Sequence, residues 1–553
     1  MTPEVAKTLS IAEQHHWFLQ QRSRRATLKR GTPGPGTLVA GTTPLGRSAV
    51  ASTLAPPPRE VWGPSVYFTD RPINGSGVVP FGRHISYGSD PTQQMNIAWQ
   101  VASPVANPFV RIGTDPRELG EQVPAALKNV STPWADIAHV LDRLPPADST
   151  AEASDEQFYA HAALDRLEPG TTYYYVVGHQ GLDSGYRDSA CRDSAYRDSG
   201  FGPSSSGTVA SFTTAPSRAM PFTFTAFGDQ GITHDAMATN NLILAQAPAF
   251  HLHAGDISYA ESGGAGLLTD SYDPRAWDSF FMETASTAAS VPWMASLGNH
   301  EMEAWYSPDG YGADVDRFDF PGNGPRACPG TYFFTYGNVA IVSLDPNDVS
   351  YEIPANLGYS GGSQTRWLGK TLKALRHDRS VDFIVVFFHH CAYCTCTSHG
   401  SEGGVREYWA PLFDRYQVDL VINGHNHVYE RTDPIKAGAP TTTAPVGATI
   451  EPATEGTTYV AAGGAGASLY AFSVPDSYEG WVDNVASVGS HVNQPGRTRV
   501  PETVAWSRVR YSGYGLLVVD VTPPLFGGRT SMAVRALDER GTEVDSFTLS
   551  RSP

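Results

Sequence analysis

Five apolar runs in this sequence each end directly in residues that can bind metal ions. The runs are six or seven residues long, which is typical of buried β-strands. In open α/β sheets the residues that follow the strands at their carboxyl ends face one crevice, where ligands bind. We therefore expect five strand ends to meet at one site. They are Gly228-Asp229, Gly255-Asp256, Gly298-Asn299-His300-Glu301, His389-His390 and Gly424-His425-Asn426-His427.

The residue types at these ends fit a site for two metal ions. Carboxylates, an amide oxygen and imidazoles together can neutralise and orient two adjacent cations. A single Gly-Asp or Gly-Asn pair is more typical of a turn, but all five ends occur in order between Asp229 and His427. We expect the glycines before the ligands to let the backbone turn sharply at the strand ends and to bring the ligand side chains close to the metals.

The chain before these runs has a different pattern. Short alternating strands separated by turn residues, such as 95–102, 109–114 and 171–178, predict a β-sandwich. From Pro221 onward, apolar runs alternate with helical stretches such as 236–247, which indicates an α/β fold. We predict a sandwich over 60–216 and a second domain over 219–553.

The N-terminus resembles a bacterial twin-arginine export signal. Arg24 and Arg25 precede a weakly apolar stretch, and Ala49-Val50-Ala51 fits the small-residue rule for signal cleavage. The sequence therefore predicts an exported protein with a signal over 1–51. The twin-arginine route carries folded cargo, often with a cofactor inserted, so this resemblance is consistent with a metal.

Composition narrows the classes of partner. The net charge of -17 repels nucleic-acid backbones, so we expect no nucleic-acid partner. No apolar run approaches the ~20 residues needed to cross a bilayer, so we expect no membrane span. A small-molecule substrate is the remaining expectation, and the oligomeric state stays open.

The motifs at the strand ends resemble those of the purple acid phosphatases, a family within the calcineurin-like metallophosphoesterases. The preceding sandwich, with LEPGTTYYYVV (167–177), resembles a fibronectin type III-like domain, which the two-domain members of the family carry. The resemblance implies an αββα-type sandwich with a dinuclear site at the carboxyl ends of its strands. The motifs are GDQG (228–231), GDISY (255–259), GNHE (298–301), VFFH (386–389) and GHNH (424–427).

The resemblance also implies a set of metal ligands. Tyr259 is the most diagnostic residue, because most metallophosphoesterases lack it. A phenolate ligand favours Fe(III) at the first metal position, and the second ion could be Fe, Zn or Mn. The implied ligands are Asp229, Tyr259 and His427 for the first metal, Asn299, His389 and His425 for the second, and Asp256 as the bridge.

The activity implied by the family is acid hydrolysis of phosphomonoesters by in-line attack of a metal-bound hydroxide. His300 is then a candidate for binding the phosphate. His399 is the candidate general acid, with His390 as its competitor. Trp305, Tyr306 and the segment 350–363 are expected to form loops over the crevice, where substrate preference would reside.

Several alternatives stay open. The same fold could hydrolyse phosphodiesters or nucleotide anhydrides, or the sandwich could be a binding module beside a vestigial metal site. His251 and His253 favour a buried core role over metal binding. The remaining motif is the CxxCxC run of Cys391, Cys394 and Cys396, which favours a loop disulfide, with Cys328 as one candidate partner, over a thiolate metal site.

Overall fold

The computed structural model describes residues 78–133, 154–182, 209–260, 274–302, 313–472, 482–483, 488–524 and 528–551. The predicted export signal over 1–51 lies outside these residues, and so does the stretch 187–199, in which Arg-Asp-Ser occurs three times. Within them, no helix is long and apolar enough to cross a membrane.

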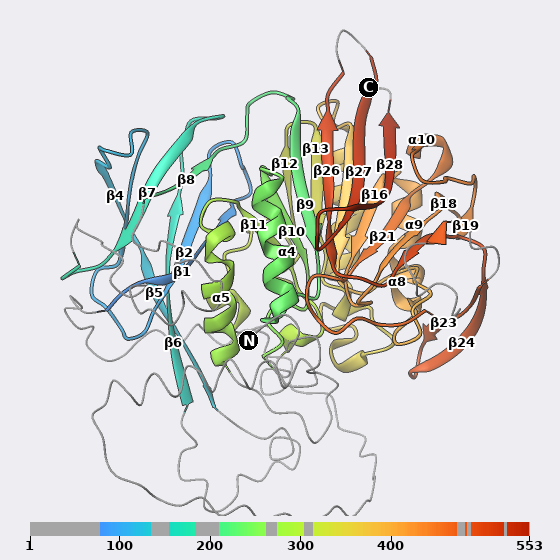
Figure 1. The fold of residues 1–553 in the computed structure, drawn as a ribbon, viewed down its shortest axis with the longest axis horizontal. Helices are drawn as coiled ribbons and strands as arrows, with labels where there is room; N and C mark the ends of the chain where they lie inside the picture. The colour runs from blue at the N-terminus through green and yellow to red at the C-terminus, as the bar shows by residue number, and fades with distance from the viewer. Residues whose placement is uncertain are drawn as a thin grey trace, which may run out of the picture.

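The N-terminal part is a β-sandwich, as predicted (Figure 1, left). One sheet has the order β1-β2-β6-β5 and the other has the order β4-β3-β7-β8. The apolar side chains of the alternating strands face each other between the sheets. The strands are β1 (Phe81–Tyr87), β2 (Met95–Val101), β3 (Phe109–Gly113), β4 (Glu121–Pro124), β5 (Ala126–Pro133), β6 (Ser154–Leu164), β7 (Thr172–Gly178) and β8 (Ala210–Thr213).

The second part contains a seven-stranded sheet that runs in the order β11-β10-β9-β26-β27-β28-β20. Strands β9, β10 and β11 are mutually parallel, so their carboxyl ends lie at one edge. The strands are β9 (Phe222–Phe227), β10 (Phe250–Ala254), β11 (Trp293–Ser296), β20 (Ala448–Ile450), β26 (Gly515–Thr522), β27 (Thr530–Asp538) and β28 (Glu543–Arg551).

An eight-stranded sheet packs against it in the order β12-β13-β14-β16-β21-β17-β25-β22. Its central strands β13, β14, β16 and β21 are parallel. The strands are β12 (Tyr332–Tyr336), β13 (Val339–Ser343), β14 (Phe383–Phe388), β16 (Leu420–Asn423), β17 (Tyr429–Thr432), β21 (Thr458–Ala462), β22 (Val482–Asp483) and β25 (Ser507–Tyr511).

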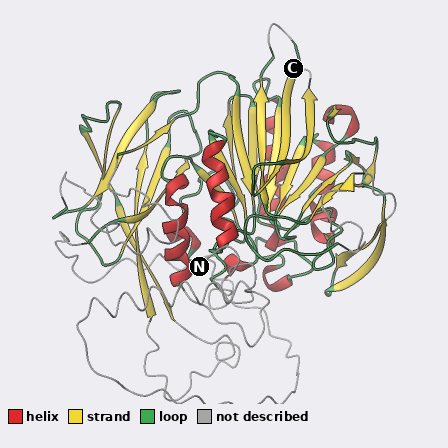
Figure 2. Cartoon of the chain, viewed as in Figure 1, coloured by secondary structure: helices red, strands yellow, loops and turns green. Residues whose placement is uncertain are grey.

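The two large sheets form the inner layers of a four-layer α/β sandwich, with helices on both outer faces (Figure 2). Strand β14 shows why its sequence is continuously apolar. Val385 and Phe387 face the opposing sheet, whereas Val386 and Phe388 face the outer helices. The helices are α4 (His234–Ala245) and α5 (Arg275–Ala288) on one side, and α7 (Ser363–His377), α8 (Gly403–Tyr408) and α9 (Ala410–Arg415) on the other.

Smaller elements complete the described part of the chain. Strands β15 (Ser401–Glu402), β23 (Val488–Gln494) and β24 (Thr498–Val504) form a three-stranded sheet beside the eight-stranded one. The others are β18 (Ile435–Lys436), β19 (Ala439–Pro440), α6 (Asp314–Arg317), α10 (Pro452–Glu455), and the 3-10 turns η2 (His300–Met302), η3 (Pro346–Asp348) and η4 (Pro354–Asn356).

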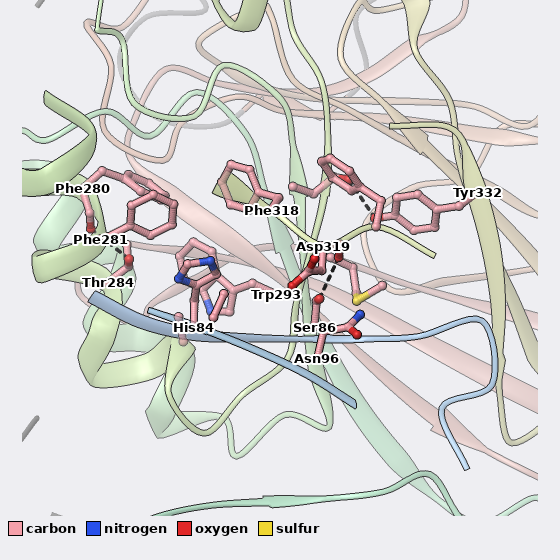
Figure 3. Close-up of a pocket in the computed structure, with 15 residues that line it drawn as sticks. His84, Ser86, Asn96, Phe280, Phe281, Thr284, Trp293, Phe318, Asp319 and Tyr332 are labelled. Atoms are coloured by element: carbon pink, nitrogen blue, oxygen red, sulfur yellow. Dashed lines mark hydrogen bonds between the residues drawn. The ribbon is translucent and has the colours of Figure 1, made fainter. Parts of the chain in front are cut away.

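The β-sandwich is docked on helix α5 and the segment that follows α6. His84 of β1 stacks on Phe281 of α5 with ring centroids 4.4 Å apart, and its Nε2 lies 3.0 Å from the carbonyl oxygen of Arg317. Figure 3 shows the cavity at this contact, where Ser86 donates a hydrogen bond of 2.8 Å to the Asp319 carbonyl. Aromatic and aliphatic side chains line most of the cavity, so it belongs to the packing between the two parts.

A buried ion pair links the two large sheets. Arg431 of β17 donates to both carboxylate oxygens of Asp545 on β28, at 2.6 and 3.0 Å. Tyr429 donates to the same carboxylate at 2.6 Å, and the Ala444 carbonyl accepts from Arg431 at 2.8 Å. The charges are therefore paired and hydrogen-bonded where no water reaches them.

Replacing Asp545 with Ala should strongly destabilise the second domain, because Arg431 would remain buried without its counter-charge. Removing one partner of such a pair typically costs about 3–5 kcal/mol. Asp520→Ala is the matched control, since Asp520 pairs with Arg535 at a site that is 40% exposed and should change stability by about 1 kcal/mol or less. Urea unfolding curves of both variants would test this, and equal midpoints would contradict it.

Candidate metal centre

The five strand ends meet in the structure as the sequence predicted. Strands β9, β10 and β11 of one sheet end at Phe227, Ala254 and Ser296, and β14 and β16 of the other end at Phe388 and Asn423. The two sheets thus place their ligand-bearing turns against each other. All seven predicted metal ligands lie in this cluster, and all seven are buried.

The first group of donor atoms surrounds the hydroxyl of Tyr259. This oxygen lies 3.1 Å from Oδ1 of Asp229 and 2.9 Å from Nε2 of His427. The same Nε2 is 3.3 Å from Oδ1 of Asp229. A phenol, a carboxylate and an imidazole therefore converge on one point.

The second group surrounds Nε2 of His389. That nitrogen lies 3.1 Å from Oδ1 of Asn299 and 3.2 Å from Nδ1 of His425. Asp256 lies between the groups, with its Oδ2 3.1 Å from the same nitrogen. The carboxylate of Asp256 has donor atoms of both groups within 4.8 Å, namely those of His389 and His425 on one side and of Asp229 and His427 on the other.

In each of the three ligand imidazoles, one nitrogen makes a hydrogen bond outside the cluster, and this bond leaves the other nitrogen facing the cluster. Nδ1 of His389 is 2.8 Å from the Ala254 carbonyl oxygen, and Nδ1 of His427 is 2.7 Å from the Ser468 carbonyl oxygen. A carbonyl oxygen only accepts, so each of these nitrogens carries the proton. His425 is turned the other way, with Nε2 3.0 Å from a carboxylate oxygen of Glu352. All three rings therefore direct a lone pair into the cluster, an arrangement typical of metal-ligating histidines.

This set of metal-binding atoms suits bound cations, and without positive charge between them the atoms repel one another. Nδ1 of His425 and Nε2 of His389 face each other at 3.2 Å, where two lone pairs repel unless a proton or a cation lies between them. Burial opposes protonation of His389, but the carboxylates of Asp256 and Asp229 outweigh it and raise its pKa to about 10. Burial and the same carboxylates raise the pKa of Tyr259 far above its usual value. The cluster therefore attracts positive charge.

The backbone at the strand ends is strained at the ligands themselves. Asp229, Asp256, Tyr259 and His425 have φ values of 62°, 50°, 51° and 67°, in the left-handed region that side-chain-bearing residues rarely adopt. Such conformations concentrate at functional sites. We predicted that the glycines would provide the turn. Of the four, only Gly255 has a positive φ, at 78°.

The other glycines serve close approach instead. A Cβ atom on Gly298 would lie 2.1 Å from Oδ1 of Asp256, and one on Gly424 would lie 2.6 Å from Oδ2 of Asp229. Any side chain at these positions would displace a ligand carboxylate. The interpretation from the sequence was therefore right about the need for glycine, whereas the positive φ of a sharp turn is found only at Gly255.

Glu301 holds two of the ligand turns together. Its carboxylate accepts hydrogen bonds from the backbone N–H groups of Asp256, Ile257 and Gly298, at 2.9, 2.7 and 2.7 Å. Burial, with the charge of Asp256, raises the pKa of Glu301 to about 8. The contacts of Glu301 are those of a carboxylate that satisfies nearby backbone donors.

The candidate catalytic histidines contact different residues of the cluster. The backbone N–H of His300 donates to Oδ1 of Asp256 at 3.0 Å, and its ring packs on Tyr259 with centroids 4.3 Å apart. The ring of His399 lies against His425, with centroids 4.0 Å apart. His390 packs on His425 at 4.2 Å, but both its ring nitrogens are buried and have no hydrogen-bond partner in the described part of the chain. Its contacts are those of a packing residue.

Two residues at the cluster were missed by the sequence analysis. Tyr470 stacks on His427 with centroids 4.0 Å apart and an interplanar angle of 11°, and its hydroxyl lies 3.3 Å from Nε2 of His399. Glu352 contacts both His399 and His425. Neither belongs to a motif at a strand end, so only the segment 350–363, predicted to cover the crevice, gave a signal for Glu352. Trp305 and Tyr306 lie outside the described residues.

The predicted loop disulfide is wrong for this structure. The four described cysteines are free and buried. Cys391 donates to the carbonyl oxygen of Gly424 at 3.0 Å, whereas Cys328 faces Tyr359 in another part of the fold. Because all four described cysteines are free, Cys328 does not cross-link the loop.

His251 and His253 lie in the core, as predicted. His251 is hydrogen-bonded to Thr225 at 2.9 Å, and both rings pack against Phe227 and Trp293. The two ring nitrogens of His253 have no hydrogen-bond partner among the described residues, which differs from the expectation of a hydrogen-bonded core histidine.

Comparison with known proteins gives two family matches. Residues 80–190 match the N-terminal domain of purple acid phosphatases, and residues 222–429 match the calcineurin-like phosphoesterases. An uncharacterized protein of Mycobacterium tuberculosis is 31% identical over 527 residues, which cover 88% of this chain and 90% of that protein. Purple acid phosphatase 23 of Arabidopsis thaliana is 28% identical over 320 residues, or 54% of this chain and 62% of that protein.

A solved structure shares the fold. Purple acid phosphatase PPD1 from yellow lupin (Lupinus luteus) seeds superposes with a TM-score of 0.60 and 20% identity, covering 86% of this chain and 75% of that one. The four-layer fold with these residues at its strand ends defines a calcineurin-like phosphoesterase. With the matched N-terminal domain, the chain belongs to the purple acid phosphatase family, and the family resemblance in the sequence is confirmed.

The full chain is first treated with a chelator. Adding Zn²⁺ to the treated protein should then raise its thermal unfolding temperature above that of the treated protein alone, because the buried metal-binding atoms gain a cation. A ligand that binds only the folded state stabilises it by about 2.7 kcal/mol at 100 times its dissociation constant. Asp256→Asn should lose most of this gain. Asp115→Asn, at an exposed pair with Arg117, should keep all of it. An equal gain in both variants would place zinc binding elsewhere.

Proposed function

We propose that this protein is an exported acid phosphatase that hydrolyses phosphomonoesters at a dinuclear metal site. One observation carries the proposal: a buried phenol, carboxylate and imidazole converge beside an amide and two imidazoles, with the carboxylate of Asp256 between the groups. The position of Tyr259 separates the purple branch from phosphoesterases without a tyrosine ligand.

The donor chemistry supports a different metal at each position. A phenolate and a carboxylate are hard anionic ligands, so Asp229, Tyr259 and His427 favour Fe(III). The amide and two imidazoles of Asn299, His389 and His425 suit a divalent Fe, Zn or Mn ion. When bound, such ions acidify water and polarise the phosphate oxygens.

The chain's own residues would position and protonate the substrate. His300, held beside Asp256 and Tyr259, would bind a phosphate oxygen. His399, which lies against His425, would donate a proton to the leaving-group oxygen. In this arrangement the two histidines would act on different oxygens of the substrate.

Export remains part of the proposal. The paired Arg24 and Arg25 and the small residues at 49–51 support it. Removing 1–51, which carry seven basic and two acidic side chains, would change the net charge from -17 to -22. Such a surface repels anionic substrates, so the cations in the cluster would dominate the local potential.

Purified protein should show a visible charge-transfer band and hydrolyse p-nitrophenyl phosphate between pH 4 and 8, with the higher rates on the acidic side. Tyr259→Phe should abolish the band, because the phenolate ligand is lost. Tyr470→Phe, which changes a tyrosine stacked on His427 outside the donor group, should keep the band. Asp256→Asn should lower kcat at least ~100-fold, since several kcal/mol of charge stabilisation are lost.

Metal content measured on the same sample completes the test. A colourless protein with two non-iron metals would contradict the purple assignment. Faster turnover of bis(p-nitrophenyl) phosphate than of the monoester would favour a phosphodiesterase. An inert protein without metal would favour the sandwich as a binding module.

A further inference from the structure

The carboxylate of Glu352 lies between two imidazoles with different proposed roles. One oxygen is 3.0 Å from Nδ1 of His399, and the other is 3.0 Å from Nε2 of His425. We infer that Glu352 is a positioning residue that orients the proton donor His399 and the metal-site imidazole His425 together. This inference rests on the proposed function, because it assigns Glu352 a part in the same reaction.

On the His425 side, Glu352 fixes the ring by accepting from Nε2. The opposite nitrogen, Nδ1, then faces the second donor group and lies 3.2 Å from Nε2 of His389. His389 and His427 achieve the same result with backbone carbonyl oxygens. His425 alone among the three depends on a side chain, so its orientation can be changed by substitution.

On the His399 side, Glu352 accepts a hydrogen bond from Nδ1 of His399, so that Nε2 of His399 faces the cluster. That nitrogen is 3.3 Å from the hydroxyl of Tyr470, which itself packs over His427. The rings of His399 and His425 lie against each other at 4.0 Å. The proton donor is therefore placed relative to the cluster through one carboxylate.

Glu352 is itself held from several directions. Glu402, buried in the segment after His399, accepts from the backbone N–H groups of Tyr351 and Glu352 at 2.8 and 3.2 Å. Arg499 on β24 donates to the Glu352 carboxylate at 3.1 Å, and Arg497 donates to its backbone carbonyl at 3.1 Å. The side chain is 12% exposed. These contacts keep the carboxylate from turning away from either imidazole.

A glutamine in place of Glu352 would break this arrangement while preserving its size. A glutamine side chain accepts at one oxygen and donates at its nitrogen, so it can accept from only one of the two imidazole N–H groups. The other imidazole must turn or lose its bond, and Arg499 loses its counter-charge. Both the second donor group and the proton donor should be affected.

Zn²⁺ titration of the chelator-treated full chain tests the His425 side without turnover. Wild type should bind two zinc ions, and Glu352→Gln should weaken one of the two sites by roughly 10–100-fold, the usual cost of losing a partner of a ligand. Glu502→Gln, which breaks an ion pair with Arg406 instead, should leave both affinities unchanged. Circular dichroism should show that all three proteins are folded.

Leaving-group dependence tests the His399 side. An alkyl phosphate needs a proton on its departing oxygen more than p-nitrophenyl phosphate does, because alkoxides are poorer leaving groups. In the metal-loaded enzyme, Glu352→Gln should therefore lower the alkyl-to-aryl ratio of kcat by roughly 10-fold or more, with similar KM values. In a His399→Ala background the same change should not lower this ratio further.

The outcomes separate this inference from the proposed function. If wild type turns over both esters while Glu352→Gln matches Glu502→Gln in turnover and zinc affinity, the inference fails and the phosphatase stands. If wild type hydrolyses neither ester, the proposed function fails, and the His399 part of the inference fails with it. Three zinc ions in wild type that fall to two in Glu352→Gln would make Glu352 a metal ligand and overturn its positioning role.

Discussion

The main constraint on this structure is the repulsion among the metal-binding atoms that are buried where the two large sheets meet. Two carboxylates, a phenol and three inward-facing imidazole nitrogens lie within a few ångströms of one another and away from water. Burying such groups without compensation is costly. The raised pKa of His389, at about 10 against the effect of burial, shows how strongly the cluster favours a positive charge. Bound cations would supply that charge.

The surrounding fold makes this concentration of donors possible. Strands that are apolar on both faces bring their ends together, and Arg431 with Asp545 ties the two sheets across the core. The strained φ values at Asp229, Asp256 and His425 lie beside the close approaches at Gly298 and Gly424, and such strain persists only where the surrounding structure holds it in place. The β-sandwich contacts this framework through α5, away from the donor atoms.

Much of this could be predicted from the sequence because the ligands follow strand ends. A continuous apolar run followed by Gly-Asp or Gly-His reports both a buried strand and a residue at its carboxyl end, and all seven predicted ligands came together. Glu352 and Tyr470 could not be found in this way, because they lie on irregular segments whose course depends on tertiary contacts such as those of Glu402. The disulfide prediction was wrong because the thiols of Cys391, Cys394 and Cys396 lie near one another but remain unbonded, and spacing alone does not distinguish these two states.

The most direct test of the central claim is anomalous diffraction from crystals of the native protein, collected on both sides of the iron and zinc absorption edges. The account predicts two metal peaks on either side of Asp256, one next to Asp229, Tyr259 and His427 and the other next to Asn299, His389 and His425, with iron at the tyrosine position. A cluster without anomalous peaks in an enzyme that hydrolyses phosphomonoesters, or metal bound only outside it, would contradict the account.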